Sequence, residues 1–511
     1  MLASVLSSAL MGIDAYIVKV EIDISDGLPA FATVGLPDNA VKESRERVTA
    51  AIKNSGFYFP SSRITANLAP ADIRKEGSAF DLPMAVGVIA ATGQVRTDFI
   101  EHTLMLGELA LDGSVRSVHG CLPVAVAAKE NQYKGVILPK SNAKEAAIVD
   151  GLDIYPVESL REAVDFLNAD QTIQPFEYNI QDAFDQFAEY TIDFSDVKGQ
   201  EHVKRAIEVA TSGGHNLIMI GPPGSGKTMV ARRIPTILPD MTLEEALETT
   251  KIHSVVGMLH GDVPLIATRP CRSPHHTISD AGLIGGGRYP RPGEVSLSHN
   301  GVLFLDELPE FRKNVLEAMR QPLEDLQVTI SRAAASYTYP ANFMLVASMN
   351  PCPCGFFGDP TRNCRCTPTQ IQSYVSRISG PLLDRIDLQV EVPAVKYKDL
   401  SSDFTGEAST AIRKRVQAAR GIQQERFSDT KIFCNANMET RHIREYCQMQ
   451  PDAQELLRVA ITQLGLSARA YDRVLKVART IADLAESPTI EAEHTSEAIQ
   501  YRSLDRSFWR R

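Results

Sequence analysis

Residues 221–228 read Gly-Pro-Pro-Gly-Ser-Gly-Lys-Thr and directly follow the apolar run Asn216-Leu-Ile-Met-Ile220. A glycine-rich loop between a buried strand and a helix binds phosphate, because successive backbone N–H groups and the helix N-terminus face the anion. In such a loop Lys227 contributes a charge to the β- and γ-phosphates, and the Thr228 hydroxyl holds Mg²⁺. An ordinary strand-to-helix turn is the alternative. We therefore predict a P-loop whose ATP-binding residues are Gly221, Pro222, Pro223, Gly224, Ser225, Gly226, Lys227 and Thr228.

Two later apolar runs end in polar residues that fit a nucleotide site. One run is followed by Asp306 and Glu307, and the next ends at Asn350. Asp306 is suited to hold Mg²⁺ together with Thr228, whereas Glu307 is suited to polarise the attacking water. Asn350 is placed to hydrogen-bond the γ-phosphate or that water. Solvated acids at a strand end are the alternative for the acidic pair, but its place downstream of a P-loop favours catalysis.

The composition is that of a globular protein with several domains. The chain has 511 residues, of which 44% are apolar and 23% charged, and its net charge is −10. The negative charge gives no general support for nucleic-acid binding, so any basic surface must be local or assembled from several subunits. The longest apolar run, Leu82–Ala91, is too short for a membrane span. Eight cysteines without a disulfide-like spacing, and an N-terminus without early basic residues, predict a cytoplasmic protein with no membrane partner.

The chain is expected to divide into an N-terminal domain, an ATPase core and a helical lid. Strand patterns such as Tyr16–Ile24 and helix patterns such as Asp81–Ala91 predict an α+β domain at the N-terminus. An acidic stretch follows, which we expect to be an extended connector, with a helix over Asp182–Tyr190 as the alternative. The P-loop segment predicts a parallel α/β sheet, and the C-terminal part shows helical spacing. The expected bounds are 1–170 for the first domain, 171–195 for the connector, 196–398 for the core and 399–511 for the lid.

A cysteine-rich loop follows Asn350 directly. Cys352 and Cys354 form one Cys-x-Cys pair, Cys364 and Cys366 form a second, and nine residues separate the pairs. Four thiolates at this spacing can complete a tetrahedral Zn²⁺ site, with the intervening glycines turning the loop. A reduced cysteine-rich loop or a redox-labile pair is the alternative. Loop 351–366 is therefore a candidate zinc site within the core.

Two arginines further along the chain belong to the same pattern. Arg385 lies in a Leu-Leu-Asp-Arg run, and Arg469 lies at the opening of a predicted helix. In this order the P-loop, the acidic pair, the strand-end amide and the arginines resemble an AAA+ ATPase of the magnesium-chelatase and replicative-helicase branch. The resemblance implies a homo-hexameric ring, in which Arg385 reaches the γ-phosphate of a neighbouring subunit and Arg469 is a second sensor on the lid. Arg473 competes for the sensor role, and a solvated salt-bridging arginine is the alternative for both.

A basic, glycine-rich segment precedes Asp306. The same resemblance implies that this insert lines the central pore of the ring. Six copies of its arginines would form a positive funnel for a phosphate backbone despite the acidic total. The hairpin-like Gln327–Arg332 is a second candidate, and a rigid intersubunit loop with paired arginines is the alternative. The candidate DNA-binding residues are Arg269, Arg272, Arg288, Arg291 and Arg332.

Three stretches of the N-terminal domain, residues 68–85, 107–113 and 136–140, are similar to the proteolytic domain of Lon proteases, which has a fold like domain 2 of ribosomal protein S5. Our alignment places Ala79 and Leu122 where a serine–lysine dyad requires its nucleophile and its base. Without a lysine base, a serine such as the neighbouring Ser78 is not activated. The resemblance therefore implies a protease-like fold that lacks the dyad and serves binding or assembly.

The order of the domains narrows the resemblance further. A Lon-like domain, a connector, a magnesium-chelatase-type AAA+ core and a helical lid, with signature stretches such as Gly213–Asn216 and Ser273–His276, resemble the ComM family of bacterial competence proteins. The family implies a hexameric helicase that drives branch migration while transforming DNA is integrated by homologous recombination. Its implied partners are single-stranded and branched DNA and recombination proteins. A chelatase-type motor that remodels proteins is the alternative, as is a scaffold in which ATP only stabilises a ring.

Overall fold

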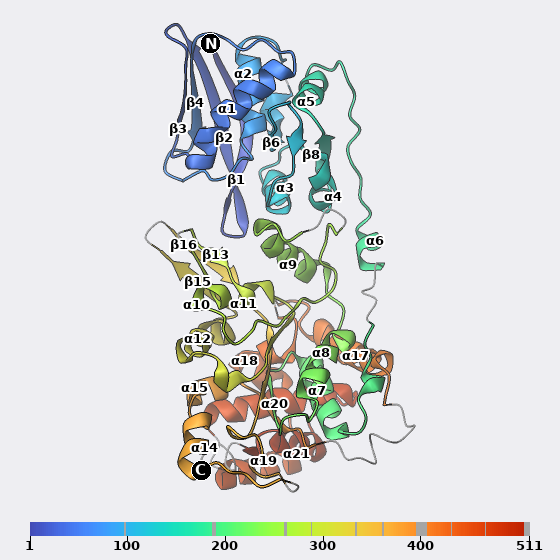
Figure 1. Ribbon diagram of the computed structural model, residues 1–511. Helices are drawn as coiled ribbons and strands as arrows, with labels where there is room; N and C mark the ends of the chain where they lie inside the picture. Colours follow the sequence, from blue (N-terminus) through green and yellow to red (C-terminus); the bar gives the residue numbers. More distant parts are fainter. Residues whose placement is uncertain are drawn as a thin grey trace. The chain divides into compact units, whose positions relative to one another are not determined.

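The chain forms two units in the computed structural model (Figure 1). Each unit has its own hydrophobic core. The first unit comprises Met1–Phe187 and Leu243–Ala267, and the second comprises Ala188–Thr242 and Thr268–Arg511. The residues that the structure describes are 1–96, 99–185, 191–259, 263–287, 289–332, 335–359, 362–394, 406–430, 432–464 and 467–504.

The first unit is built on a mixed sheet of seven strands in the order β3-β4-β2-β1-β5-β8-β9. The long strands β1 and β2 form an antiparallel hairpin, and β2 also pairs antiparallel with β4. The other neighbouring strands are parallel. The strands are β1 (Leu2–Met11), β2 (Asp14–Ser25), β3 (Ala30–Val34), β4 (Arg63–Ala69), β5 (Thr103–Met105), β8 (Gly135–Pro139) and β9 (Asp153–Val157).

Helices cover this sheet because its strands alternate buried and exposed residues, most clearly along β2. Helix α2 (Asp81–Ala91) is buried along its whole length and packs on β1 and β2. Helix α1 (Asn39–Asn54) begins at Asp38, whose carboxylate accepts a hydrogen bond from the backbone N–H of Val41 at 2.8 Å. The predicted α+β character of this domain is confirmed. The remaining elements include β6 (Glu108–Leu109), β7 (Val115–Arg116), α3 (Cys121–Glu130), α4 (Ala143–Ala146) and α5 (Leu160–Leu167).

Helix α9 (Leu243–Val255) belongs to the first unit although it follows the P-loop in the sequence. It packs on α3, and the Ser254 hydroxyl donates a hydrogen bond to the buried carboxylate of Glu145. The expected bounds placed this helix in the ATPase core 196–398. The structure differs because the partners that bury α9 come from a distant part of the sequence.

The second unit contains a sheet of five parallel strands in the order β11-β14-β17-β10-β18. Strands β10, β14 and β17 are buried along their whole length, as expected for a parallel sheet covered on both faces. The carboxyl ends of all five strands meet at one edge. The strands are β11 (Cys271–Arg272), β14 (Val302–Leu305), β17 (Met344–Met349), β10 (Leu217–Ile220) and β18 (Leu388–Glu391).

The helices of this unit come both before and after the P-loop in the sequence. They are α7 (Glu201–Gly213), α8 (Lys227–Arg233), α10 (Asp280–Leu283), α11 (Glu294–Leu297), α12 (Lys313–Ala318), α13 (Arg320–Asp325), α14 (Pro368–Val375) and α15 (Gly380–Leu383). The C-terminal part is helical, as the spacing predicts. Its helices are α17 (Ser409–Arg426), α18 (Thr440–Tyr446), α19 (Pro451–Leu464), α20 (Ala468–Leu484) and α21 (Ala492–Gln500). Helix α20 packs on α7, α17, α18 and α21.

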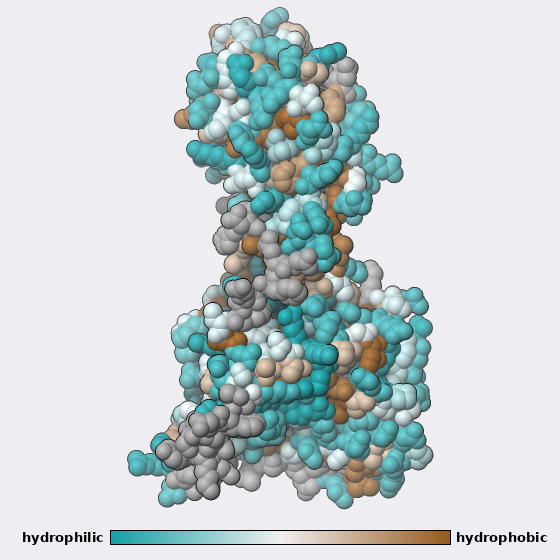
Figure 2. Space-filling view, turned by 90° about the vertical axis from the view of Figure 1, so that its right-hand side faces the viewer, coloured by the Kyte–Doolittle hydropathy of each residue, from teal (hydrophilic) through white to brown (hydrophobic). Residues whose placement is uncertain are grey.

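Among its described residues, the acidic stretch before the second unit includes the short helix α6 (Ile180–Asp185). The alternative prediction is a helix over Asp182–Tyr190. Its first residues, up to Asp185, are helical, and residues 186–190 lie outside the described part of the chain. The face of the molecule in Figure 2 is largely hydrophilic, with hydrophobic residues in small separate groups. In the described part of the chain, every helix is too short or too polar to span a bilayer.

Candidate active site

The P-loop lies between β10 and α8, at the carboxyl edge of the five-stranded sheet. Gly226 has a φ of 91°, a left-handed conformation that turns the loop into the helix. The ammonium group of Lys227 donates hydrogen bonds to the carbonyl oxygens of Gly221 at 2.7 Å and of Pro222 at 3.0 Å. It also lies 3.3 Å from Oδ1 of Asn350, at the end of β17. The structure thus brings together the predicted P-loop lysine and the predicted strand-end amide.

The charge balance around Lys227 fits an anionic ligand. Burial lowers the pKa of Lys227 to about 8, and the nearby Asp306 and Glu307 oppose this shift only in part. A phosphate group beside the ammonium would favour its charged form. The carboxyl edge is therefore prepared for negative charge at this point.

The groups expected to hold Mg²⁺ are in contact. The Thr228 hydroxyl donates a hydrogen bond to Oδ2 of Asp306 at 2.7 Å. The Ser348 hydroxyl, one strand away on β17, donates to Oδ1 of the same carboxylate. Hydroxyl and carboxylate oxygens are the hard ligands that Mg²⁺ prefers, so the residues fit the ion. Ser348 was missed in the sequence, where its only signal is a polar residue inside an apolar run.

Glu307 joins this cluster through its backbone N–H, which donates to Oδ1 of Asp306 at 3.1 Å, whereas its carboxylate has a different neighbour. Its backbone has a φ of 56°, in the left-handed region, and its side chain is 57% exposed. The Glu307 carboxylate is therefore accessible to a water molecule. Its Oε2 lies 3.8 Å from Nδ1 of His276, and the His276 ring packs on His275 with centroids 4.1 Å apart. The sequence marked His276 only as part of a family signature, because no local pattern links it to the acidic pair.

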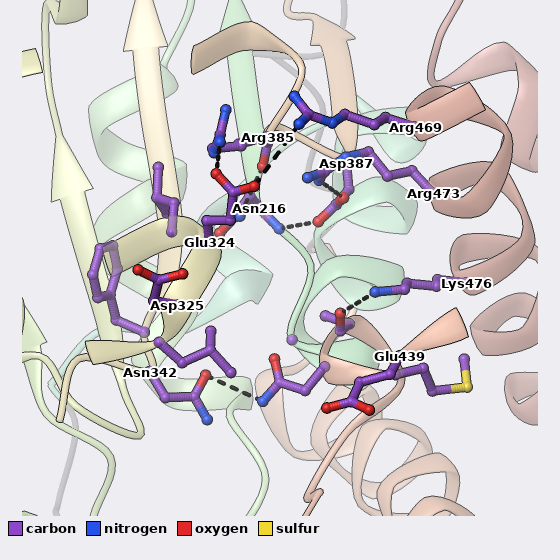
Figure 3. Close-up of a pocket in the computed structure, with 17 residues that line it drawn as sticks. Asn216, Glu324, Asp325, Asn342, Arg385, Asp387, Glu439, Arg469, Arg473 and Lys476 are labelled. Atoms are coloured by element: carbon purple, nitrogen blue, oxygen red, sulfur yellow. Dashed lines mark hydrogen bonds and ion pairs between the residues drawn. The ribbon is translucent and has the colours of Figure 1, made fainter. Parts of the chain in front are cut away.

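The two predicted arginines lie at the opposite, amino-terminal edge of the sheet. Arg385, Arg469 and Arg473 line a cavity of about 360 Å³ beside Asn216 and Asn342, which precede β10 and β17 (Figure 3). Strand β10 has four residues, so the two edges are separated by about 13 Å of strand. The P-loop and these arginines therefore do not meet within one chain.

Arg385 is a buried arginine with incomplete pairing. Its side chain is 7% exposed, one guanidinium nitrogen pairs with the carboxylate of Glu324, and another donates to the carbonyl oxygen of Pro381 at 2.6 Å. Its Nε has no hydrogen-bond partner in the described part of the chain. Burial lowers the pKa of Arg385, and the positive charges of Arg469 and Arg473 add to that effect. Arg385 and Arg469 thus share one carboxylate, that of Glu324, as their ion-pair partner among the described residues.

The structure separates the two candidates for the second sensor. Arg473 pairs with the buried carboxylate of Asp387, which also accepts a hydrogen bond from the backbone N–H of Asn216 at 2.9 Å. Burial opposes ionisation of Asp387, but Arg473 and His215 outweigh it and hold the pKa of this carboxyl below its usual range. Arg469 is 63% exposed and its nearest acidic group is Glu324 at 3.9 Å. This difference favours Arg469 as the arginine free for a ligand.

Asn216 holds Arg385 in place. Its amide nitrogen donates to the carbonyl oxygen of Arg385 at 2.9 Å, and its amide oxygen accepts from the backbone N–H of Leu345 at 2.7 Å. One side chain thus joins the starts of three neighbouring strands. The signature Gly213–Asn216 has a physical role that the sequence did not reveal.

The four paired cysteines converge. The Sγ of Cys352 lies 3.4 Å from that of Cys354 and 3.7 Å from that of Cys364, and the last two are 3.6 Å apart. All four sulfur atoms, including that of Cys366, lie within 4.8 Å of one another. A tetrahedral Zn²⁺ with Zn–S bonds of about 2.3 Å separates its sulfur atoms by about 3.8 Å. Backbone N–H groups of Phe356 and Arg365 lower the pKa of Cys354, which favours the thiolate that binds metal.

Two of the five candidate DNA-binding arginines are held by contacts within the second unit. Arg269 donates to the carbonyl oxygens of Pro239 at 2.8 Å and of Asn300 at 2.7 Å. Arg272 forms a two-bond ion pair with Glu294, at 2.7 and 2.9 Å. These contacts engage both guanidinium groups within the unit, and a role of Arg269 and Arg272 in DNA binding stays a prediction. Arg288 lies outside the described residues.

The other two arginines, Arg291 and Arg332, lie on two hairpins that pack together, which we call the hairpin surface. The hairpins are β12–β13 (Gly285–Gly286 with Arg291–Pro292) and β15–β16 (Gln327–Ser331 with Ser336–Pro340). The Tyr339 hydroxyl joins them by donating to the carbonyl oxygen of Pro290 at 2.6 Å. Arg291 and Arg332 are exposed there. The hydroxyl groups of Thr329 and Thr338, and of Ser331 and Ser336, pair across the exposed face at 2.9 and 2.7 Å.

The protease-like positions of the first unit hold no serine–lysine pair. The Ser78 hydroxyl donates to the carboxylate of Glu108, and Leu122 is fully buried with its N–H donating to Glu145 at 2.9 Å. The buried Lys75 donates to the carbonyl oxygens of Pro70 and Ile73. These contacts agree with the expected lack of a dyad. Loss of peptidase activity stays a prediction.

Comparison with known proteins identifies the family. Three models of the magnesium-chelatase subunit ChlI match the chain: "Subunit ChlI of Mg-chelatase" at residues 20–142, "Magnesium chelatase, subunit ChlI" at 193–400 and its C-terminal part at 406–502. Competence protein ComM of Haemophilus influenzae is 44% identical over 99% of this chain and 98% of its own length. The chain belongs to the ComM family. The uncharacterized protein YifB of Escherichia coli is 43% identical over 99% of this chain and 98% of its own length.

ComM-family membership confirms the expected resemblance and the fold class. The matches cover the α+β domain, the parallel-sheet core and the helical C-terminal region. Lon protease 2 of Bacillus subtilis is also similar, at 28% identity over 45% of each chain. A magnesium-chelatase-like AAA+ family implies an ATPase that uses ATP and Mg²⁺.

Proposed function

We propose that the chain is the subunit of a homo-hexameric, ATP-driven DNA motor that promotes branch migration during the integration of transforming DNA by homologous recombination. The observation that carries the proposal is the separation of two complementary half-sites on one sheet. Lys227 and the acidic pair lie at its carboxyl edge, and Arg385 and Arg469 lie at its amino edge. A head-to-tail ring joins each half-site to the other half on the next subunit, and it closes on itself.

In this ring each group has a separate task in ATP hydrolysis. Bound Mg²⁺, held by Thr228 and Asp306, would neutralise charge on the β- and γ-phosphate oxygens. Glu307 orients the attacking water, and its exposure leaves room for that water. Asn350 hydrogen-bonds the water or the γ-phosphate. Arg385 of the neighbouring subunit stabilises the negative charge that develops as the phosphate leaves.

We assign DNA contacts to the hairpin surface. Arg291 and Arg332 offer exposed positive charge, and the paired hydroxyl groups beside them suit phosphate oxygens. Such groups grip a backbone without reading the base sequence. Arg288, which lies close to Arg291 in the sequence, completes the proposed set. The first unit, without a dyad, is assigned to assembly or to binding recombination proteins.

We also assign Zn²⁺ to the four cysteines. The sulfur–sulfur separations match a tetrahedral site, and the loop begins directly after Asn350. A metal there would fix the position of Asn350 beside Lys227. Zinc in this role is structural, since four protein ligands leave no open position for chemistry.

The test is a branch-migration assay on a three-stranded DNA junction, with ATP hydrolysis measured in parallel. The wild-type chain should move the junction, and DNA should stimulate its ATPase. The double variant Arg291→Ala/Arg332→Ala should lose both effects while its DNA-free ATPase remains, because it removes phosphate contacts only. Arg458→Ala, an exposed lid arginine paired with Glu455, is the control and should behave as wild type. DNA affinity should fall steeply with salt, and less steeply in the double variant.

A protein-remodelling motor of the magnesium-chelatase type is the second candidate. It is favoured by the three family models, which all describe a magnesium-chelatase subunit. A wild-type chain that hydrolyses ATP, ignores DNA and leaves the junction unmoved would support this candidate and contradict the DNA motor.

A further inference from the structure

The cysteine loop lies directly against the P-loop. The N–H of Gly355 donates to the carbonyl oxygen of Cys352 at 2.9 Å, which makes a tight turn around the first Cys-x-Cys pair. A Cβ atom added at Gly355 would lie 2.4 Å from Cδ and 2.6 Å from Cγ of Pro223, within the predicted ATP-binding loop. No real Cβ atom is tolerated at such distances. The backbone of the cysteine loop is therefore in close contact with the pyrrolidine ring of Pro223 in the P-loop.

A second contact joins the same two loops. Asn350 comes two residues before Cys352 and lies 3.3 Å from the ammonium nitrogen of Lys227. Cys352 itself is fully buried. The residues on either side of Cys352 thus contact Lys227 and Pro223, both of which belong to the P-loop. A shift of Cys352 therefore changes the contacts of both Lys227 and Pro223 with the cysteine loop.

We propose that zinc at the four cysteines and nucleotide in the P-loop strengthen each other's binding, with the contact of Gly355 and Pro223 as the coupling element. This inference rests on the proposed function, because it requires that both ligands bind. Zinc fixes loop 351–366 in one conformation. Without it the loop regains conformational freedom, and nucleotide binding must order it again at a cost in affinity.

Coupling of this kind is reciprocal. If zinc raises the affinity for nucleotide by some factor, nucleotide raises the affinity for zinc by the same factor. Couplings between sites usually amount to about 5- to 150-fold, and two direct contacts between neighbouring loops predict about tenfold here. The chain would then retain its metal best while nucleotide is bound.

The experiment measures zinc and nucleotide on the same full-length protein. Glu307→Gln serves as the parent because it should hold ATP without turnover. The zinc affinity is measured by equilibrium competition with a chromogenic chelator, with and without ATP and Mg²⁺, and the affinity for a fluorescent ATP analogue is measured before and after zinc removal. ATP should raise the zinc affinity about tenfold, and zinc removal should weaken nucleotide binding about tenfold. Mg²⁺ alone should leave the zinc affinity unchanged.

Two glycines in the loop form a matched pair of variants. Gly355 and Gly358 have φ values of 85° and 80°, so alanine strains the backbone equally at both. A Cβ atom at Gly358 meets nothing within 4 Å, whereas at Gly355 it collides with Pro223. In the parent background, Gly358→Ala should keep the tenfold coupling. Gly355→Ala should still bind zinc but should lose most of the dependence on nucleotide.

Pro223→Ala approaches the same contact from the other side and covers the case in which Gly355→Ala does not fold. It should also uncouple zinc affinity from nucleotide. If the parent protein binds both ligands and neither ligand changes the affinity for the other, the inference is overturned while the proposed function stands. A protein that carries no zinc overturns the inference together with the zinc assignment, and one that binds no nucleotide overturns it together with the proposed ATPase.

Discussion

The two edges of the five-stranded sheet differ in the charged groups that they hold. At the carboxyl edge, backbone carbonyl oxygens and the carboxylates of Asp306 and Glu307 lie near Lys227, whose pKa burial has lowered to about 8. At the amino edge, Arg385 and Arg469 share the carboxylate of Glu324, and Arg473 pairs with Asp387. The first edge has the groups that bind and activate a nucleotide, and the second has those that stabilise a leaving phosphate. Neither edge is a complete reaction site, which is why we place the reaction between subunits.

The largest expected effect comes from two variants, each of which removes one essential side chain from one edge of the sheet. Arg385→Ala and Lys227→Ala should each lose ATPase activity, by about 10³-fold for the arginine. Mixed in equal amounts, the two inactive proteins should regain activity, because about a quarter of the interfaces in a random ring join an intact P-loop to an intact arginine. Steady-state ATPase assays on re-formed mixed rings measure this. An inactive mixture in which rings demonstrably contain both variants would place the whole site within one chain.

Much of the carboxyl edge could be predicted because its residues lie in short contiguous motifs. The P-loop, the Asp306–Glu307 pair and Asn350 each follow a recognisable apolar run, so the fold of the sheet brings them together. Ser348 and Glu324 have no such local signal, since their contacts are with residues that are distant in the sequence.

The basic insert and α9 show a second limit. The sequence gives the charge of Arg272 but not its partner Glu294. For the segment of α9 it gives only a place within the expected core bounds, and not the α3 surface on which the helix packs. In both cases the deciding partner follows from tertiary packing, which a local pattern does not contain.

A second variant tests the carboxyl edge alone. Glu307→Gln should keep ATP binding but lower turnover by at least about 10²-fold, because the amide no longer polarises the water. Nucleotide binding and single-turnover hydrolysis separate the two effects. Glu310→Gln is the control, since Glu310 lies three residues further and pairs with Arg377 at 3.0 Å. Equal losses in both variants would show that the effect of Glu307 is not specific.

The lowered pKa of Lys227 predicts a pH dependence that the arginine edge cannot produce. The phosphate requires the charged ammonium, and burial makes the free site lose its proton above about pH 8. ATP affinity should therefore be level near neutral pH and fall by up to about tenfold per pH unit above 8, whereas arginines stay charged throughout this range. Titration of a fluorescent ATP analogue from about pH 7 to about pH 9 checks this. An affinity that stays level to the upper limit would mean that Lys227 is not desolvated in the free protein.

The smallest expected effect concerns the carboxylate that occupies the arginine edge in a single chain. Glu324 pairs with Arg385 and lies 3.9 Å from Arg469, so an incoming phosphate from a neighbouring subunit has to replace it. Glu324→Gln keeps the shape and removes the competing charge. Because Glu324 is 53% exposed, the pair is worth at most about 1 kcal/mol, and the apparent ATP affinity of the ring should rise by up to about fivefold. Asp325→Asn makes the same charge change at the next residue of the cavity, outside the arginine pairs drawn in Figure 3. If both variants raise the affinity equally, only the overall charge matters; if Glu324→Gln lowers it, Glu324 positions the arginines and does not compete with the phosphate.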